Sequence, residues 1–213
     1  MEKQEIRTFG RRHGKKLSTR KQQLIANTLP GLLPRNIKNN GDLILEIGFG
    51  AGEHLRALAA ERPDAEIIGA EPFMNGVAAL LSAITSESDN TVRAEYKNIY
   101  IWPDDVRDLL RDSDLKFNQI WVLHPDPWPK ARHEKRRLLH SEFLNIIGRA
   151  LRPNGEIIIG TDHWEYFDWI VNQIPETNLC AEIPDIAVIK TRYQSKNMAE
   201  TAAPKYLILR NKN

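Results

Sequence analysis

The sequence predicts an α/β fold, in which a mostly parallel sheet carries helices on both faces. Short runs rich in Ile, Leu and Val alternate along most of the 213 residues with segments whose apolar residues recur every three or four positions. Three closely spaced glycines also join the first of these runs to the first helical segment. With 41% hydrophobic residues the chain can bury one full core, so we expect one main domain.

The apolar runs predict strands, and the amphipathic segments between them predict helices. The strands are expected at residues 42–48, 66–71, 91–96, 117–123, 156–161 and 205–210. The helices are expected at residues 53–61, 75–84, 103–111, 136–151 and 164–174. Pro103-Asp104-Asp105 is a favourable helix start, and Arg152-Pro153-Asn154-Gly155 is expected to end the helix that precedes it.

Two segments lack such a pattern. Residues 1–17 are too polar for the core, and we expect a flexible basic arm there, followed by a single domain over residues 18–213. Residues 184–204 show no clear periodicity, and we expect them to form a long loop on the ligand side of the sheet.

Positive charge is concentrated in two places, although the net charge of the chain is only +2. Residues 1–22 hold eight Lys and Arg side chains against Glu2 and Glu5. A second cluster contains Lys130, Arg132, Lys135, Arg136 and Arg137. Clusters of this kind neutralise nucleic-acid phosphates, and we expect the arm to become ordered when it does so.

Several classes of protein and of site are excluded by composition. Cys180 is the single cysteine, so neither an intramolecular disulfide nor a cysteine-based zinc site can form. The six histidines show no metal-ligand or triad spacing, and we expect no metal site. The N-terminus lacks the apolar core of a signal peptide, and nowhere do about 18 apolar residues run together. We therefore expect a cytoplasmic protein without membrane contact.

The glycine loop Glu46-Ile47-Gly48-Phe49-Gly50-Ala51-Gly52 follows the first strand. Its glycines allow a tight turn and a close approach of backbone to a nucleoside, and Glu71 can hold ribose hydroxyls at the end of the second strand. Both nicotinamide dinucleotides and S-adenosylmethionine fit this pattern. The spacing lacks the third dinucleotide glycine, and Glu46 would repel a pyrophosphate but attract the cationic groups of S-adenosylmethionine. A tight turn without any ligand is the alternative.

A proline-rich loop, His124-Pro125-Asp126-Pro127-Trp128-Pro129, follows the strand expected at residues 117–123. The prolines restrict the backbone, so Asp126 and Trp128 would be held in place at little entropic cost. Trp128 offers a flat face for a base or for packing, and the basic run that begins at Lys130 can meet phosphates. A proline-rich turn before a solvated basic helix face is the alternative.

On these motifs the chain resembles the bacterial tRNA (guanine-N7)-methyltransferases, which modify guanine 46 in the variable loop. The matching pieces lie at residues 7–18, 45–55, 69–73, 124–138, 160–167 and 191–196, and the fourth is the most specific. The resemblance implies a Rossmann-like class I methyltransferase fold with seven strands, the last of them antiparallel. It also implies transfer of a methyl group from S-adenosylmethionine to guanine N7 of tRNA, which yields 7-methylguanosine and S-adenosylhomocysteine. Monomer and homodimer both stay open.

The same resemblance assigns roles to individual residues. Together with the glycine loop, it implies an S-adenosylmethionine site formed by Glu46, Gly48, Gly50, Gly52, Glu71, Asn98 and Asp126. It implies that the target guanosine meets Lys130, Asp162, Thr191, Arg192, Tyr193 and Gln194. Three positions depart from the family: Asn98 stands where an acid is common, His124 replaces an aromatic residue, and Gln194 replaces a glutamate.

The chemistry of guanine N7 selects the catalytic candidates. This nitrogen carries a lone pair and no proton, so the transfer needs no obligatory general base. Positioning and carboxylates that face the developing positive charge should dominate, and Asp126 and Asp162 are our catalytic candidates. Asp162 could alternatively cap the following helix. In that helix we expect Trp164 and Trp169 to belong to the core.

Three other functions remain to be weighed. One is a nucleic-acid methyltransferase that acts on an exocyclic amine, which usually shows two prolines before the aromatic residue of the loop. Another is a non-catalytic RNA-binding subunit with a relic cofactor pocket. A nicotinamide-dependent oxidoreductase is the most distant, because no hydride-transfer acid or substrate domain is evident.

Overall fold

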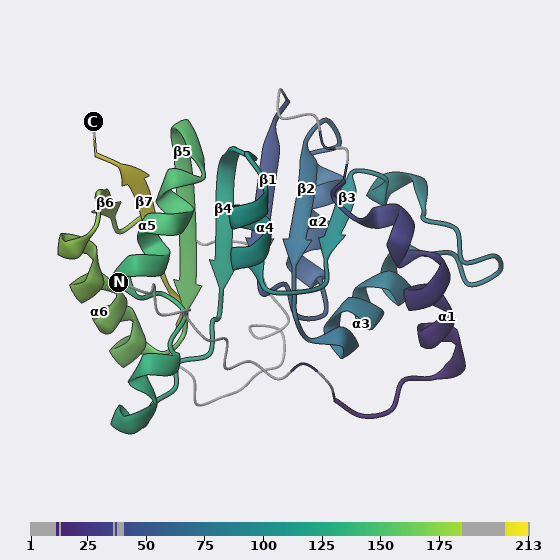
Figure 1. Cartoon of the computed structure of the whole chain (residues 1–213), viewed down its shortest axis with the longest axis horizontal. Helices are drawn as coiled ribbons and strands as arrows, with labels where there is room; N and C mark the ends of the chain where they lie inside the picture. The colour runs from purple at the N-terminus through teal and green to yellow at the C-terminus, as the bar shows by residue number, and fades with distance from the viewer. Residues whose placement is uncertain (1–11, 13, 36, 38–40, 185–202, 213) are drawn as a thin grey trace.

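The computed structural model describes residues 12, 14–35, 37, 41–184 and 203–212. Its seven strands form one sheet in the order β3-β2-β1-β4-β5-β7-β6 (Figure 1). The strands are β1 (Leu43–Ile47), β2 (Glu66–Ala70), β3 (Ile99–Trp102), β4 (Phe117–Leu123), β5 (Leu151–Thr161), β6 (Leu179–Glu182) and β7 (Lys205–Asn211). Strands β1 to β5 are parallel to one another, whereas β7 is antiparallel to both β5 and β6. The predicted α/β class and the antiparallel last strand are thus confirmed.

Helices cover both faces of the sheet, as predicted. They are α1 (Thr19–Asn27), α2 (Glu53–Glu61), α3 (Met74–Ile84), α4 (Val106–Asp112), α5 (Ser141–Arg149) and α6 (Trp164–Gln173). Short 3₁₀ turns are η1 (Leu29–Leu32), η2 (Ala94–Tyr96), η3 (Ala131–Arg136) and η4 (Ile174–Glu176). One buried apolar cluster joins the sheet to α4, α5 and α6, and a second joins it to α1, α2 and α3.

Strand β1 is apolar at every position except Glu46, because both of its faces are covered by helices. Leu43, Leu45 and Ile47 belong to the first cluster, while Ile44 between them belongs to the second. A central parallel strand with both faces covered needs apolar residues at every position, not at alternate ones. Glu46 is the single exception in this strand, and its buried carboxylate must therefore be stabilised locally.

The third strand was predicted in the wrong place. Residues 91–96 form an isolated bridge at Val92, paired with Thr85, and then the turn η2, and most of them are exposed. The strand β3 lies at Ile99–Trp102 instead, where Ile99 and Ile101 are fully buried and alternate with half-buried residues. Burial at every second position, and not the β-branched residues at 91–92, decides which segment pairs with β2.

The helix predicted over residues 136–151 is also shorter than expected. The basic run forms the 3₁₀ turn η3, the α-helix α5 covers only Ser141–Arg149, and Leu151 already pairs with Phe117 as the start of β5. Helix α1 and strand β6 were not predicted. Of the long loop expected over residues 184–204, residues 185–202 lie outside the described part of the chain.

Candidate functional site

The candidate site lies at the carboxyl edge of the parallel strands, where the chain leaves β1, β2, β4 and β5 (Figure 1). The glycine loop follows β1, Glu71 follows β2, the proline-rich loop follows β4 and Asp162 follows β5. Strand β1 has β2 on one side and β4 on the other, so the order of the strands reverses between β1 and β4. Open α/β sheets bind their ligands at such a reversal point.

The glycine loop has the conformation that its sequence predicts. Gly48, Gly50 and Gly52 have φ angles of +75°, +57° and +79°, a region that residues with a side chain rarely adopt. A Cβ atom added to Gly76 of α3 would lie 2.4 Å from the carbonyl oxygen of Gly50, so α3 packs directly against the loop. A Cβ atom on Gly48 or Gly50 would meet no atom within 4 Å. The loop is therefore supported from behind and accessible in front.

Glu71 braces this loop from the end of β2. Its two carboxylate oxygens accept hydrogen bonds from the backbone nitrogens of Gly50 at 2.8 Å and Phe73 at 2.9 Å. Burial raises the pKa of Glu71, the two hydrogen bonds oppose that rise, and the negative charges of Asp126 and Glu46 add to it. Three carboxylates thus lie within electrostatic reach of one another, and a cation between them would relieve their repulsion.

Glu46 is hydrogen-bonded within the domain. Its Oε2 lies 3.0 Å from Nδ1 of His54 on α2, and the two side chains are only 3% exposed. The ring of His54 in turn packs on Trp121 of β4, with 4.8 Å between the ring centroids. His54 was not among the predicted site residues, because nothing in its local sequence indicates a contact with a strand eight residues earlier.

The proline-rich loop contains two residues in the left-handed region. His124 and Trp128 have φ angles of +48° and +43°, which cost roughly 1–3 kcal/mol each for residues other than glycine. Such a conformation persists where surrounding contacts hold it. Asp126 lies between these two residues and is exposed to solvent.

Arg137 supplies the main contact that holds the loop. Its Nε donates a hydrogen bond of 3.0 Å to the carbonyl oxygen of Pro127, and its guanidinium lies over the rings of Tyr166 and Trp169 at 5.4 and 4.9 Å. The side chain is buried, so Arg137 is not a phosphate ligand. Arg136 also does not point freely into solvent, because its guanidinium lies 5.0 Å from the centroid of the Trp128 ring.

The basic run therefore has two parts with different roles. Arg136 and Arg137 fix the proline-rich loop, whereas Lys130, Arg132 and Lys135 are exposed on or beside η3. The alternative of a solvated basic helix face therefore does not hold for Arg136 and Arg137. Trp128 packs against Arg136 and also meets His133 edge to face, with 5.7 Å between the ring centroids.

Asp162 lies at the end of β5 and is not a helix cap. His163 caps α6, because its Nδ1 accepts a hydrogen bond of 3.2 Å from the backbone nitrogen of Tyr166. The Oδ1 atom of Asp162 lies 3.5 Å from Nδ1 of His124 at the end of β4. The structure thus places Asp162 beside the loop that carries Asp126, as the candidate roles require.

Asn98 does not lie at this edge, which corrects its assignment to the cofactor site. It precedes β3, and its side-chain nitrogen donates to the carbonyl oxygens of Ala59, Arg62 and Ala65 at the end of α2 and before β2. These carbonyls lie at the amino edge of the sheet, opposite the glycine loop. The resemblance had supplied this assignment, and the observed β3 begins directly after Asn98, so the residue lies before the strand and not at its carboxyl end.

Asp104 occupies the place at the carboxyl end of β3 that Asn98 was expected to fill. Its Oδ1 lies 2.9 Å from Nη2 of Arg12, and both side chains are partly exposed. Gly14 donates to Oδ1 of Asn75 at 2.8 Å, and Nδ2 of Asn75 donates to the carbonyl oxygen of Lys15 at 2.8 Å. Residues 12, 14 and 15 of the expected arm thus contact the rim of the site, while residues 1–11 and 13 lie outside the described part.

Four predicted site residues, Thr191, Arg192, Tyr193 and Gln194, lie outside the described residues. Trp169 is partly buried among side chains, but Trp164 is 51% exposed, so its expected place in the core is wrong.

Within the described ranges, no group of three or more His, Cys, Asp or Glu side chains could hold a metal ion. The described helices also include none of the length and apolarity needed to cross a membrane.

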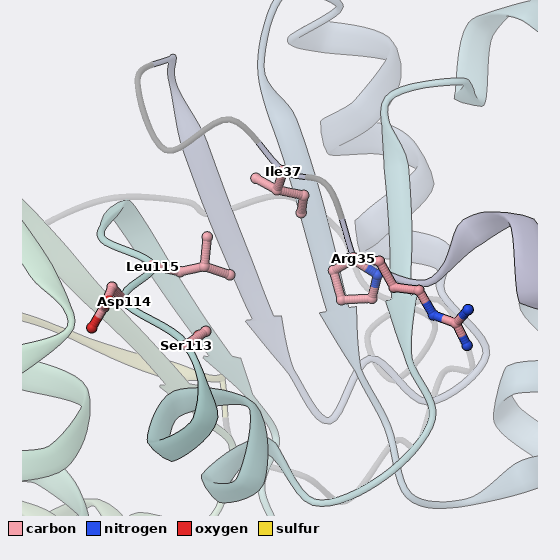
Figure 2. A pocket seen from close by; sticks show the side chains of 6 residues that line it. Arg35, Ile37, Ser113, Asp114 and Leu115 are labelled. Carbon is pink, nitrogen blue, oxygen red and sulfur yellow. The ribbon is translucent and has the colours of Figure 1, made fainter.

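A pocket at the amino edge of the sheet is separate from this site. It is lined by Pro34, Arg35, Ile37, Ser113, Asp114 and Leu115, several of which Figure 2 labels. These residues precede β1 and β4, whereas the glycine loop and Asp126 follow the same two strands. The amino-edge pocket therefore contributes nothing to the candidate site.

Comparison with known proteins agrees with this geometry. The model of the family Methyltransf_4, described as "Putative methyltransferase", matches residues 40–203. The tRNA (guanine-N(7)-)-methyltransferase of Granulibacter bethesdensis is 36% identical over 217 residues, which cover 97% of this chain and 95% of the relative. The enzyme of the same name from Paracoccus denitrificans is 34% identical over 96% of this chain and 94% of its own.

Solved structures show the same fold at low sequence identity. The precorrin-6y C5,15-methyltransferase of Geobacter metallireducens GS-15 matches with a TM-score of 0.55 and 18% identity, over 92% of this chain and 90% of that one. This likeness concerns the fold alone. The family model and the similarity to the two tRNA methyltransferases, over almost the whole of each chain, lead to one conclusion: this chain belongs to the family of S-adenosylmethionine-dependent tRNA (guanine-N7)-methyltransferases.

Proposed function

We propose that this protein transfers a methyl group from S-adenosylmethionine to N7 of guanine 46 in the tRNA variable loop. The products are 7-methylguanosine in the tRNA and S-adenosylhomocysteine. One observation carries the proposal: Glu46, Glu71 and Asp126 surround an accessible glycine loop at the reversal point of the sheet. The names of the relatives specify tRNA and the N7 atom, and the resemblance described above supplies position 46.

The residues at the carboxyl edge fit S-adenosylmethionine. Gly48 and Gly50 leave room for the donor beside the loop, and Glu71 offers acceptor oxygens to ribose hydroxyls. Asp126 and Glu46 face a cationic ligand with negative charge, which a pyrophosphate would not tolerate. Asp104 is our candidate for the adenine end, because it follows the strand next to Glu71 and its carboxylate can accept from an amino group.

The protein's part in the reaction is to orient the reactants and to stabilise the charge that forms. The bound donor supplies a methyl group on a positively charged sulfur. Because guanine N7 carries no proton, the reaction needs no general base at the site. The backbone of Asp126 lies between two residues in strained conformations, and the carboxylate of Asp162 lies beside His124, so both acids are positioned at this edge before the purine arrives. They can then face the positive charge that develops on the purine.

The exposed cations of the basic run would hold the tRNA backbone. Lys130, Arg132 and Lys135 lie directly after the loop that carries Asp126, so phosphates bound there would bring a nucleoside to the carboxyl edge. Thr191 to Gln194 would contact the target guanosine, as the resemblance implies. We further propose that residues 18–213 act as one domain in the cytoplasm, that residues 1–17 form a basic arm for tRNA, and that no metal takes part.

The decisive experiment is methylation of unmodified tRNA with isotope-labelled S-adenosylmethionine, followed by mass spectrometry of the nucleosides. We expect label in 7-methylguanosine, and no label when guanine 46 of the tRNA is replaced by adenine. Label on an exocyclic amine would favour the other nucleic-acid methyltransferases. Tight tRNA binding without S-adenosylmethionine binding would favour a non-catalytic subunit.

A further inference from the structure

Trp164 is a large aromatic side chain that the proposed reaction does not yet use. It is the first residue of α6, two positions after Asp162, and 51% of its surface is exposed. Among the described residues, Trp164 and Ile183 are the large hydrophobic side chains that are exposed to this degree. Trp169 on the same helix differs from Trp164, because its ring is packed against His140, Tyr166 and Arg137.

Two contacts fix the exposed indole in position. The ammonium group of Lys205 lies 4.5 Å from the centroid of the Trp164 ring, and the indole Nε1 donates to the carbonyl oxygen of Ala203 at 3.3 Å. Lys205 pairs with Thr161, the last residue of β5, because β7 begins where β5 ends. Trp164 and Lys205 therefore both lie at the carboxyl edge, next to Asp162.

We propose that Trp164 and Lys205 form a stacking platform for a tRNA base adjacent to the target guanine. This inference rests on the proposed function. A base that is drawn out of its stack to reach a catalytic pocket leaves its neighbours without a partner. An aromatic ring at the rim of the pocket can replace that partner, since every base has a flat face that stacks on an indole.

The arrangement of charge agrees with a nucleotide as the occupant. Lys205 places a cation beside the ring, where it can meet the phosphate of the stacked nucleotide. Because the indole is already held by Lys205 and Ala203, stacking would cost little additional side-chain entropy. The platform adds a contact that positions the tRNA without touching the methyl donor.

The test compares Trp164→Ala, Trp164→Phe and Trp164→Leu, with Ile183→Ala as the matched control for an exposed apolar side chain. We expect Trp164→Ala to raise the KM for tRNA by roughly 5- to 150-fold, the range that loss of one base–aromatic stack produces. Phe should restore most of the affinity and Leu should not, because only Phe keeps a flat ring. The affinity for S-adenosylmethionine, measured by calorimetry, should stay within about twofold of the wild-type value in all variants and serves as the check of folding.

Filter-binding titrations of tRNA give a reading that does not depend on turnover. Lys205→Met should lower the slope of log affinity against log salt by about 1, as loss of one phosphate contact predicts. An unchanged tRNA affinity in Trp164→Ala, or full rescue by Leu, would overturn the platform. If the wild-type protein methylated no tRNA, the proposed function would fail, whereas methylation with an insensitive Trp164→Ala would remove the platform alone.

Discussion

Nδ1 of His54 lies 3.0 Å from Oε2 of Glu46, and both side chains are buried at the point where the glycine loop passes from β1 into α2. The tautomer of His54 with hydrogen on Nδ1 can donate to the carboxylate in this geometry. The contact ties the strand that precedes the loop to the helix that follows it. It also stabilises a carboxylate that would otherwise be costly to bury.

Replacing His54 should therefore destabilise the domain. We expect His54→Leu to lower the free energy of unfolding by about 2–3 kcal/mol, since it leaves the buried Glu46 carboxylate without its donor. The double variant Glu46→Leu with His54→Leu should recover part of that loss, because no unpaired buried charge remains. Urea denaturation of the two single variants and the double variant measures the coupling. Strictly additive losses would show that the pair does not act as a unit.

Asp126→Ala should abolish most turnover and leave the fold intact. The side chain is exposed, so the free energy of unfolding should change by less than about 0.5 kcal/mol. Loss of one preoriented charge that faces the transition state should lower kcat by about 100-fold or more. Asp168→Ala, an exposed acid on α6, is the control and should keep wild-type kcat. Near-normal turnover of the Asp126 variant would remove it from the mechanism.

Glu71 should make stability depend on pH in a definite direction. Its pKa is raised from 4.5, chiefly by burial, so ionising Glu71 costs more in the folded chain than in the unfolded one. Its contribution to stability is fully present below pH 4.5 and is lost as the pH rises through the folded-state pKa. The stability of wild type relative to Glu71→Gln should therefore fall between pH 4.5 and neutral pH. Urea midpoints of both proteins across this range provide the test, and a rising difference would contradict it.

Arg132 and Arg137 should behave differently although both belong to the basic run. Arg132→Ala should weaken tRNA binding and lower its salt slope by about 1, with no change in stability. Arg137→Ala should lower the free energy of unfolding by about 2–3 kcal/mol, because it removes a buried hydrogen bond from a charged group to Pro127. Filter binding and urea denaturation on the same two variants separate the roles. Equal effects on tRNA affinity and on stability in the two variants would refute the division.

Asp104 and Asn98 allow a direct test of which end of β3 serves the cofactor. Asp104→Ala should weaken S-adenosylmethionine binding by roughly fivefold or more, the loss of about one hydrogen bond to a charged acceptor. Asn98→Ala should leave that affinity unchanged and lower stability, since it removes the donor to two part-buried carbonyl groups and one exposed carbonyl group. Calorimetric titration decides between them, and the opposite ranking would restore Asn98 to the site.

The fold and the glycine loop could be predicted because both follow from local rules. Apolar runs identified β1, β2, β4 and β5, and the positive φ angles of the loop require the glycines that the sequence supplies. The position of β3 was missed because both Thr91-Val92 and Ile99–Trp102 contain strand-favouring residues, and the alternating burial of Ile99 and Ile101 shows which segment pairs with β2. Asn98, which the resemblance had assigned to the cofactor site, precedes this strand and lies at the amino edge.

Contacts between distant residues explain the remaining differences. The sequence indicates that Arg137 is a solvated cation like its neighbours. In the structure it is buried, and it contacts the ring of Trp169 and the carbonyl oxygen of Pro127. His54 meets Glu46 only because α2 folds back over β1. Neither partner is indicated by spacing or composition, so such residues become visible only when the elements are packed.

The antiparallel direction of β7 decides which edge of the sheet its first residue reaches. Strand β6 ends at Glu182 and β7 begins at Lys205, and the pairing of Glu182 with Ile208 places both of these ends toward the same rim as Asp162 (Figure 1). The chain between them thus departs from and returns to the reactive side. Antiparallel pairing therefore brings Lys205 to the edge that holds Asp162, whereas a β7 parallel to β5 would place its first residue at the opposite edge.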